Sequence, residues 1–89
     1  AVERDFSFLF EDSVSFAQIE AAIRKLGIKE LRAVAPAEIF RGGNIGVVKH
    51  SMLVRTTFQS HERTLRDDDM NAWSTWIIDV LKALGGQQR

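Results

Sequence analysis

The stretch of residues 38–70, EIFRGGNIGVVKHSMLVRTTFQSHERTLRDDDM, decides the fold of this chain. Its pattern is typical of a strand end, a glycine-rich loop, a second strand and the start of a helix. Polar and apolar residues alternate along residues 50–59, which predicts a half-buried strand. One face would carry Met52, Val54, Thr56 and Phe58, and the other Ser51, Leu53, Arg55 and Thr57. The glycines predict a long-looped hairpin with the strand before them.

That preceding strand, expected over residues 31–41, contains Pro36. Proline cannot donate to a strand ladder, so the segment is expected at a sheet edge or at a bulge. The alternation of side chains cannot be followed through the proline. The pattern therefore leaves open whether Phe40 points into the core or onto an open sheet face, although burial is the commoner fate of a phenylalanine.

Residues 4–10 also alternate strictly, which predicts a first strand. Its core face would carry Phe6, Phe8 and Phe10, and its other face Asp5, Ser7 and Leu9. A capping box formed by Ser15 and Gln18 predicts the start of a helix. This helix runs to about Leu26, where Gly27 can end it, and its apolar stripe comprises Phe16, Ile19, Ile23 and Leu26.

A second helix follows the three aspartates at residues 67–69, which stabilise a helix N-terminus. Its apolar stripe comprises Met70, Trp73, Ile77, Leu81 and Leu84, and Gly85 and Gly86 end it. The predicted order is βαββαβ, and the fold class is α+β. We expect a ferredoxin-like sandwich in which two helices cover one face of an antiparallel sheet, with the last strand short or missing.

Composition limits the classes of function. The 89 residues are expected to form one domain, 1–89, excised from a longer chain because the sequence starts on a strand-like segment without methionine. Twelve basic and twelve acidic residues cancel, so nucleic-acid contacts would have to be local. Basic residues do cluster in the central stretch, yet on charge alone a solvated mixed surface is favoured. The cluster comprises Arg41, Lys49, His50, Arg55, Arg63 and Arg66.

The sequence offers no catalytic constellation, so we expect no enzyme activity in these residues. There is no serine or cysteine nucleophile motif, and His50 and His61 lack metal-ligand spacing. Residues 67–69 are explained by the helix start without a magnesium site. The chain has no apolar segment long enough to span a membrane, and its first residues lack the basic and apolar regions of a signal peptide, so a soluble domain is expected.

Several short motifs, in order, cover nearly the whole chain. They are Arg4-Asp5, Phe40-Arg41-Gly42, His50-Ser51, Phe58-Gln59 and Glu62-Arg63-Thr64-Leu65 before the acidic triplet. With them the chain resembles the ferredoxin-fold anticodon-binding domain at the C-terminus of the bacterial phenylalanyl-tRNA synthetase β subunit. The family usually has tyrosine at Phe40, often lysine at His50, and commonly threonine or serine at Arg66. Arg66 therefore weakens the helix cap and becomes a candidate phosphate contact.

The resemblance implies a noncatalytic domain that holds the anticodon stem-loop of phenylalanine tRNA. Aminoacylation, with ATP and magnesium, would take place on the catalytic α subunit of the parent phenylalanine-tRNA ligase, and no cofactor is expected in these residues. The family's contacts match Ser7, Phe40 and Ser51 on the open face. Aromatic rings stack unpaired bases and small hydroxyl residues let them approach.

Among the basic residues, Arg41 and Lys49 flank the glycine loop beside the open face, and we rank them as RNA contacts before Arg55 or Arg63. Arg63 and Thr64 have a structural alternative, in which they fix the turn into the second helix. The rival function is a ferredoxin-like module that binds a protein or a regulatory ligand. Salt dependence distinguishes the two, because phosphate contacts weaken steeply as the salt concentration rises.

Overall fold

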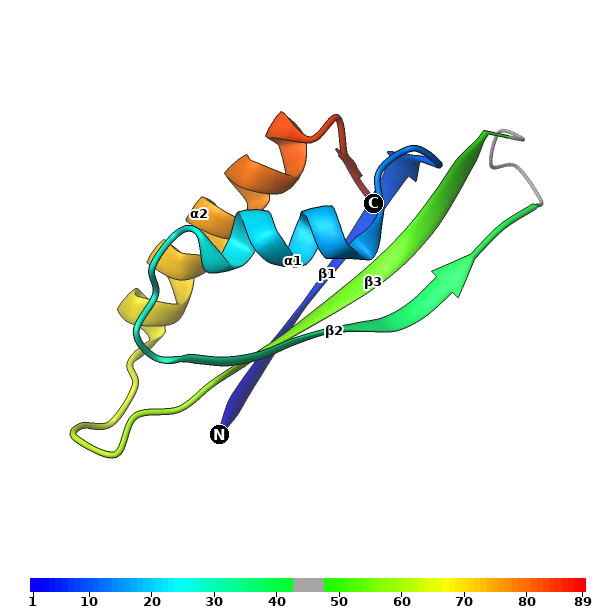
Figure 1. Ribbon diagram of the computed structural model, residues 1–89. Coiled ribbons are helices and arrows are strands. Elements are labelled where there is room, and N and C mark those ends of the chain that lie inside the picture. Colours follow the sequence, from blue (N-terminus) through cyan, green and yellow to red (C-terminus); the bar gives the residue numbers. More distant parts are fainter. Residues whose placement is uncertain (43–47) are drawn as a thin grey trace.

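The computed structural model describes residues 1–42 and 48–89 of the chain (Figure 1). Its central glycine loop therefore lies largely outside the described residues. The elements run in the predicted order: β1 (Val2–Glu11), α1 (Phe16–Arg24), β2 (Leu31–Phe40), β3 (Lys49–Phe58), α2 (Asp67–Ala83) and β4 (Gln87–Gln88). Within those described ranges, no helix has the length and apolar character needed to cross a membrane.

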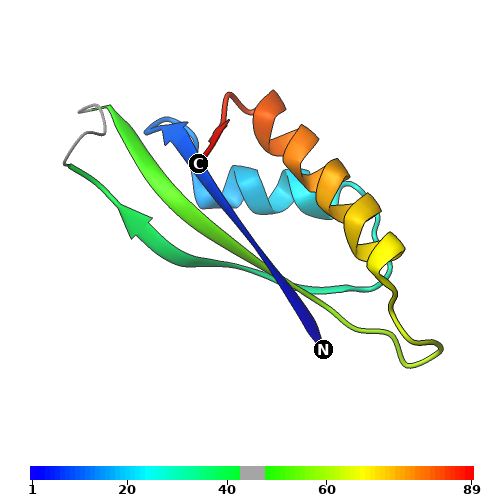
Figure 2. The same cartoon turned by 180° about the vertical axis from the view of Figure 1, so that it is seen from behind.

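The strands form one antiparallel sheet in the order β2-β3-β1-β4. β1 pairs with β3 along its whole length, from Val2 opposite Phe58 to Glu11 opposite Lys49. β4 pairs with β1 at only two positions, so the last strand is present but short. Both helices lie on the same side of the sheet, as the two opposite views show (Figures 1 and 2). The predicted ferredoxin-like sandwich is thereby confirmed.

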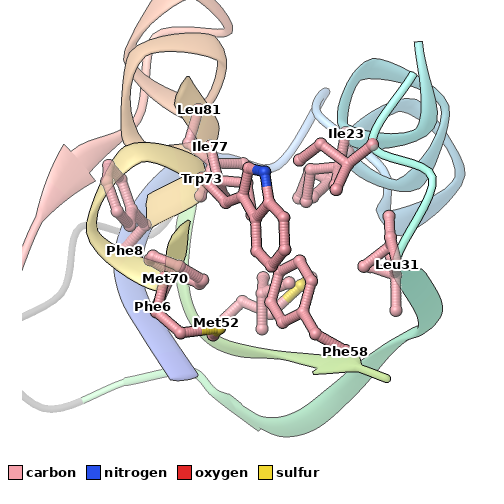
Figure 3. Packing of buried hydrophobic residues seen from close by; sticks show 14 of the residues in the cluster. Phe6, Phe8, Ile23, Leu31, Met52, Phe58, Met70, Trp73, Ile77 and Leu81 are labelled. Atoms are coloured by element: carbon pink, nitrogen blue, oxygen red, sulfur yellow. The ribbon is translucent and has the colours of Figure 1, made fainter. Parts of the chain in front are cut away.

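The core lies between the helices and the sheet, and both predicted periodicities define it. Alternate residues of β1 and β3 meet the stripes of α1 and α2, because strands repeat every two residues and helices every 3.6. Trp73 of α2 stacks on Phe58 of β3, with ring centroids 5.1 Å apart (Figure 3). The most completely buried side chains are Phe8, Phe10, Phe58, Ile19, Ile23, Ile77, Leu81, Val54 and Thr56.

The predicted capping box begins α1. The Gln18 amide N–H donates to the Ser15 hydroxyl at 3.2 Å, and the Ser15 amide N–H donates to the Gln18 side-chain oxygen at 2.8 Å. These two bonds satisfy amides that have no partner within the helix. The chain leaves the helix through Gly27, whose φ of 71° favours a residue without a Cβ.

The start of α2 lacks a side-chain cap from Arg66, as the sequence predicted. Asp69 compensates in part, since its carboxylate accepts the Arg66 amide N–H at 3.0 Å. The two glycines after the helix have different roles. Gly85 has a φ of 86°, whereas a Cβ on Gly86 would lie 2.7 Å from the Phe10 ring and from the Leu81 carbonyl oxygen. Gly86 therefore allows the chain end to approach β1 closely enough to form β4.

β2 is an edge strand and also contains a bulge, so both places predicted for Pro36 apply. The register shifts between Pro36, opposite Val54, and Glu38, opposite Leu53. After the shift Phe40 lies directly opposite Ser51. Residues paired across two strands share one face of the sheet. Phe40 is therefore on the open face, which decides the question that the sequence pattern left open.

Candidate nucleic-acid interface

The sheet face that the helices leave uncovered, the open face, carries most of the predicted contact residues. Leu9, Ser51 and Phe40 form one row across β1, β3 and β2, because Ser51 pairs with both of the others. The next row holds Ser7, Leu53 and Glu38. Ser7, Phe40 and Ser51 thus share the face. Phe40 and Ser51 are direct neighbours, and Ser7 lies one row away.

Phe40 is the most accessible ring of this face, with 57% of its surface exposed. Ser51 beside it is half-buried, and so is Leu9 at the far end of the row. An exposed ring next to a small hydroxyl residue offers a stacking surface and a hydrogen-bonding group to an unpaired base. The row also includes Leu9, which the sequence argument left out of the site although its position in β1 already placed it on this face.

The two basic residues that flank the glycine loop are separated by the structure. Lys49 is on the open face, opposite Glu11, with 3.9 Å between its Nζ and the Glu11 Oε1. Arg41 instead donates from Nη1 to the Asp12 Oδ1 at 2.5 Å. The same oxygen is 3.0 Å from Nδ1 of His50, a core-face residue. Asp12 thus holds Arg41 together with His50, whereas Lys49 is the flanking basic residue that the strand pairing places on the open face.

Hydrogen bonds from His50 and then Arg41 lower the pKa of Asp12, and together they outweigh the effect of desolvation. Asp12 is therefore ionised at neutral pH. An ionised carboxylate can only accept hydrogen bonds, so the proton in the His50–Asp12 bond belongs to Nδ1 of the imidazole. His50 is buried, with its ring centroid 6.1 Å from that of Phe10, its direct neighbour on β1.

Arg55 lies on the open face but already has a partner. Its Nε and Nη2 donate to the two carboxylate oxygens of Asp5, each at 3.0 Å, across the paired strands β1 and β3. The bond lowers the pKa of Asp5 and raises that of Arg55. A phosphate would have to compete with this two-bond pair. Arg55 is therefore a weaker candidate for an RNA contact than Lys49, whose carboxylate partner is 3.9 Å away.

Arg63 has the structural role that the sequence offered as an alternative. It donates to Asp69 at 2.6 Å and to Glu30 at 3.4 Å, which connects the turn before α2 to the turn before β2. The pair lowers the pKa of Asp69 and raises that of Arg63. With Asp69 also capping α2, the acidic triplet is explained by helix stabilisation. Arg66 is exposed at the same turn.

A cavity of about 290 Å³ lies at the other end of the sheet, between the start of β1 and the turn before α2. Its lining includes Val2, Phe58, Ser60 and Thr64. Val2 pairs with Phe58, eight residues along β1 from the pair of Phe10 and His50. The cavity is therefore separate from the row of Phe40 and Ser51, and Arg63, which also lines it, is already paired with Asp69 and Glu30.

Comparison with known proteins identifies the class. Residues 1–89, the whole chain, match the family model of the ferredoxin-fold anticodon binding domain. The chain belongs to this family. Its relatives include the phenylalanine–tRNA ligase beta subunit of Mesorhizobium japonicum, which is 32% identical over 90 residues covering 100% of this chain and 11% of the relative.

Two further relatives carry the same name. The beta subunit of Lactococcus lactis is 38% identical over 72 residues, covering 81% of this chain and 9% of the relative. That of Geobacter sulfurreducens is 31% identical over 80 residues, covering 90% of this chain and 10% of the relative. The chain therefore spans about a tenth of the length of these curated relatives.

Proposed function

We propose that this chain is a noncatalytic domain that holds the anticodon region of phenylalanine tRNA for aminoacylation by phenylalanyl-tRNA synthetase. The family and the names of the relatives support a role connected with tRNA. The observation that carries the proposal further is the exposed Phe40 ring directly opposite Ser51 on the open face. An anticodon loop presents unstacked bases that such a ring can stack against.

In this proposal Ser7, Phe40 and Ser51 contact bases, and Lys49 contacts the phosphate backbone. Arg55 contributes only when a phosphate replaces Asp5 as its partner, whereas Arg41 stays paired with Asp12. Leu9 extends the apolar part of the contact surface beside Ser51. Base contacts supply discrimination, whereas phosphate contacts supply position and salt dependence.

The remaining steps of the reaction belong to other parts of the proposed assembly. This domain would be joined through its parent chain to a catalytic α subunit, where ATP and magnesium act. The reaction would take place in the cytoplasm, where tRNA is charged for protein synthesis. The domain's contribution is then orientation of the tRNA, which lowers the entropic cost of bringing its acceptor end to the catalytic centre.

An NMR titration of the 89-residue chain tests the proposal. One sample receives a phenylalanine anticodon stem-loop, and the other receives a stem-loop of scrambled loop sequence. We expect stronger shifts with the cognate loop, confined to Ser7, Phe40, Ser51 and their neighbours on the open face. No shifts at millimolar RNA, or equal shifts spread over α1 and α2, would reject RNA binding by this face.

A protein-interaction module of the same fold is the rival function, and one observation favours it. Ile39, Phe40 and Val48, near the adjoining ends of β2 and β3, are all more than half exposed. Such a group of apolar residues would also suit a protein partner. Binding measured at two salt concentrations separates the two functions, because RNA affinity falls steeply with salt and apolar association does not.

A further inference from the structure

Asp12 connects three strands at the end of the sheet where β2 and β3 adjoin the glycine loop. Its Oδ1 accepts from Arg41, just after β2, and from His50 in β3. Its backbone N–H donates to the Val48 carbonyl oxygen at 2.7 Å, just before β3. One residue at the end of β1 thus contacts both sides of the hairpin. We call Asp12, Arg41 and His50 the Asp12 cluster.

The Asp12 cluster lies next to Phe40 and Ser51, the proposed base-contacting pair, but not on the open face. Arg41 directly follows Phe40 in the chain, and His50 directly precedes Ser51. Neighbouring residues of a strand point to opposite faces. The His50 side chain is only 4% exposed and faces the core, while Ser51 is on the open face. The cluster therefore contacts the backbone segments that carry Phe40 and Ser51 without occupying the open face.

Little apolar packing holds the last residues of β2, although His50 and Met52 in the neighbouring strand β3 are buried. The ends of β2 and β3 extend beyond both helices (Figures 1 and 2). Ile39 points toward the helix side, opposite Met52, yet it is 55% exposed, and Val48 is 59% exposed. Segments with few buried apolar contacts open locally at low free-energy cost. Among the described residues, polar contacts such as those of the Asp12 cluster are then the main restraint on the Phe40 backbone besides the strand pairing.

We propose that Asp12 is a positioning residue that, by holding Arg41 and His50, fixes Phe40 and Ser51 in the arrangement that receives an unpaired RNA base. The inference rests on the proposed function and adds a residue to it. Asp12 does not touch the RNA. It acts by pre-organisation, because a ring that is ordered before binding loses less conformational entropy when a base stacks on it.

A simple alternative treats Asp12 as a surface charge that repels RNA. The two explanations predict opposite signs for Asp12→Asn. This substitution raises the formal net charge from zero to +1, so the repulsion model predicts tighter RNA binding. The positioning model predicts weaker binding, because the neutral amide holds Arg41 and His50 less strongly. The sign of the change therefore decides between the two models.

Asp5 supplies a matched control on the same strand. Its carboxylate also pairs with an arginine of a neighbouring strand, and its side chain is 34% exposed against 35% for Asp12. Asp5→Asn changes the net charge by the same amount. Asp5 lies opposite Arg55, four residues along β3 from Ser51, the partner of Phe40. We expect Asp5→Asn to bind the stem-loop as tightly as the unmodified chain or more tightly.

The experiment measures two quantities for each variant of the 89-residue chain. The first is affinity for the phenylalanine anticodon stem-loop. The second, measured without RNA, is the heteronuclear NOE of the Phe40 amide, which reports backbone order. For Asp12→Asn we expect affinity to fall by up to about tenfold, which is part of the contribution that one stacked base makes to binding. We also expect a lower NOE for the Phe40 amide. Unchanged or tighter binding, or an unchanged NOE, would overturn the proposal.

Arg41→Gln provides a second route, since the Arg41 side chain is 59% exposed and its replacement leaves the core intact. Alone it should also lower the Phe40 NOE. Combined with Asp12→Asn it should weaken binding no further than Asp12→Asn alone, because residues that act through one contact are not additive. Additive losses would mean that Arg41 acts on RNA independently of Asp12, which contradicts the proposal.

These measurements also separate the two proposals. If the unmodified chain shows no stem-loop shifts, the proposed function fails. The NOE without RNA still tests whether Asp12 orders the Phe40 segment.

Discussion

The two faces of β3 differ in what holds them. His50, Met52, Val54, Thr56 and Phe58 on the core face are each no more than 3% exposed. Ser51, Leu53, Arg55 and Thr57 on the open face are only half-buried. Burial of apolar surface stabilises the first set. Cross-strand pairs such as Arg55 with Asp5 arrange the second set. One ten-residue strand thus has one face that stabilises the fold and one face that is available for binding.

This comparison predicts that the effect of a substitution depends on which of the two faces its position in the two-residue repeat belongs to. Changes on the core face should unfold the chain, and changes on the open face should alter binding while leaving stability nearly intact. The following predictions test that separation, beginning with the largest expected effect.

Phe8→Ala should cause the largest loss of stability. Phe8 is fully buried and its ring stacks on Phe10, with centroids 5.9 Å apart. Replacement leaves a cavity and costs about 3–5 kcal/mol, a large fraction of the folding free energy of a domain this small. Urea denaturation followed by tryptophan fluorescence would measure it. Leu9→Ala, one residue along and half-buried on the open face, is the control and should cost clearly less; equal losses would contradict the separation.

Phe40→Ala should have the opposite effect, with little loss of stability and a clear loss of RNA binding. Because the ring is more than half exposed, the free energy of unfolding should change by less than about 0.5 kcal/mol. Stem-loop binding should lose roughly 1–3 kcal/mol, the contribution of one stacked base. Ile39→Ala is the matched control, since Ile39 is equally exposed but belongs to the other face. If Phe40→Ala binds RNA as tightly as the unmodified chain, Phe40 is not part of the binding site.

Acid should weaken the fold through three ion pairs outside the apolar core. The pKa values of Asp5, Asp12 and Asp69 are all lowered, chiefly by hydrogen bonds from Arg55, His50 and Arg63 respectively. The unfolded chain, with aspartate pKa values of about 3.9, therefore binds more protons than the folded chain as pH falls. The stabilisation is present above that value and is lost on going down through the folded pKa values.

The urea midpoint measured between pH 6 and pH 2 would check this loss. Asp69→Asn removes one of the three carboxylates and should make the stability profile less steep below about pH 4. A profile as steep as that of the unmodified chain would mean that Asp69 titrates alike in the folded and unfolded states.

Arg55→Gln should have the smallest effect. Exposed ion pairs contribute little to stability, and Asp5 already neutralises the Arg55 charge. RNA affinity should change by no more than about twofold. Lys49→Gln is the informative comparison, since removing one phosphate contact should reduce the salt slope of binding by about 0.7. A larger slope change in Arg55→Gln than in Lys49→Gln would reverse their order as RNA contacts.

Much of this protein could be predicted from local pattern. The alternation around Phe8 and Val54, the helix stripes and the capping box of Ser15 and Gln18 depend on residues close in sequence, and the structure confirms each. The side-chain contacts of the site were harder to predict from the sequence. Arg41 was expected beside the open face, but its partner Asp12 is 29 residues away in the chain, a separation over which no repeat carries information.

The sequence by itself determined the order of elements and most residues of the core, and it limited β2 to a sheet edge or a bulge, because hydrophobic periodicity and the missing proline N–H act locally. Only the tertiary structure decided the face of Phe40. The bulge after Pro36 breaks the two-residue repeat, and pairing with Ser51 restores a defined register. The charge partners were likewise decided there, since Arg55 and Asp5, 50 residues apart, meet only when β1 and β3 pair.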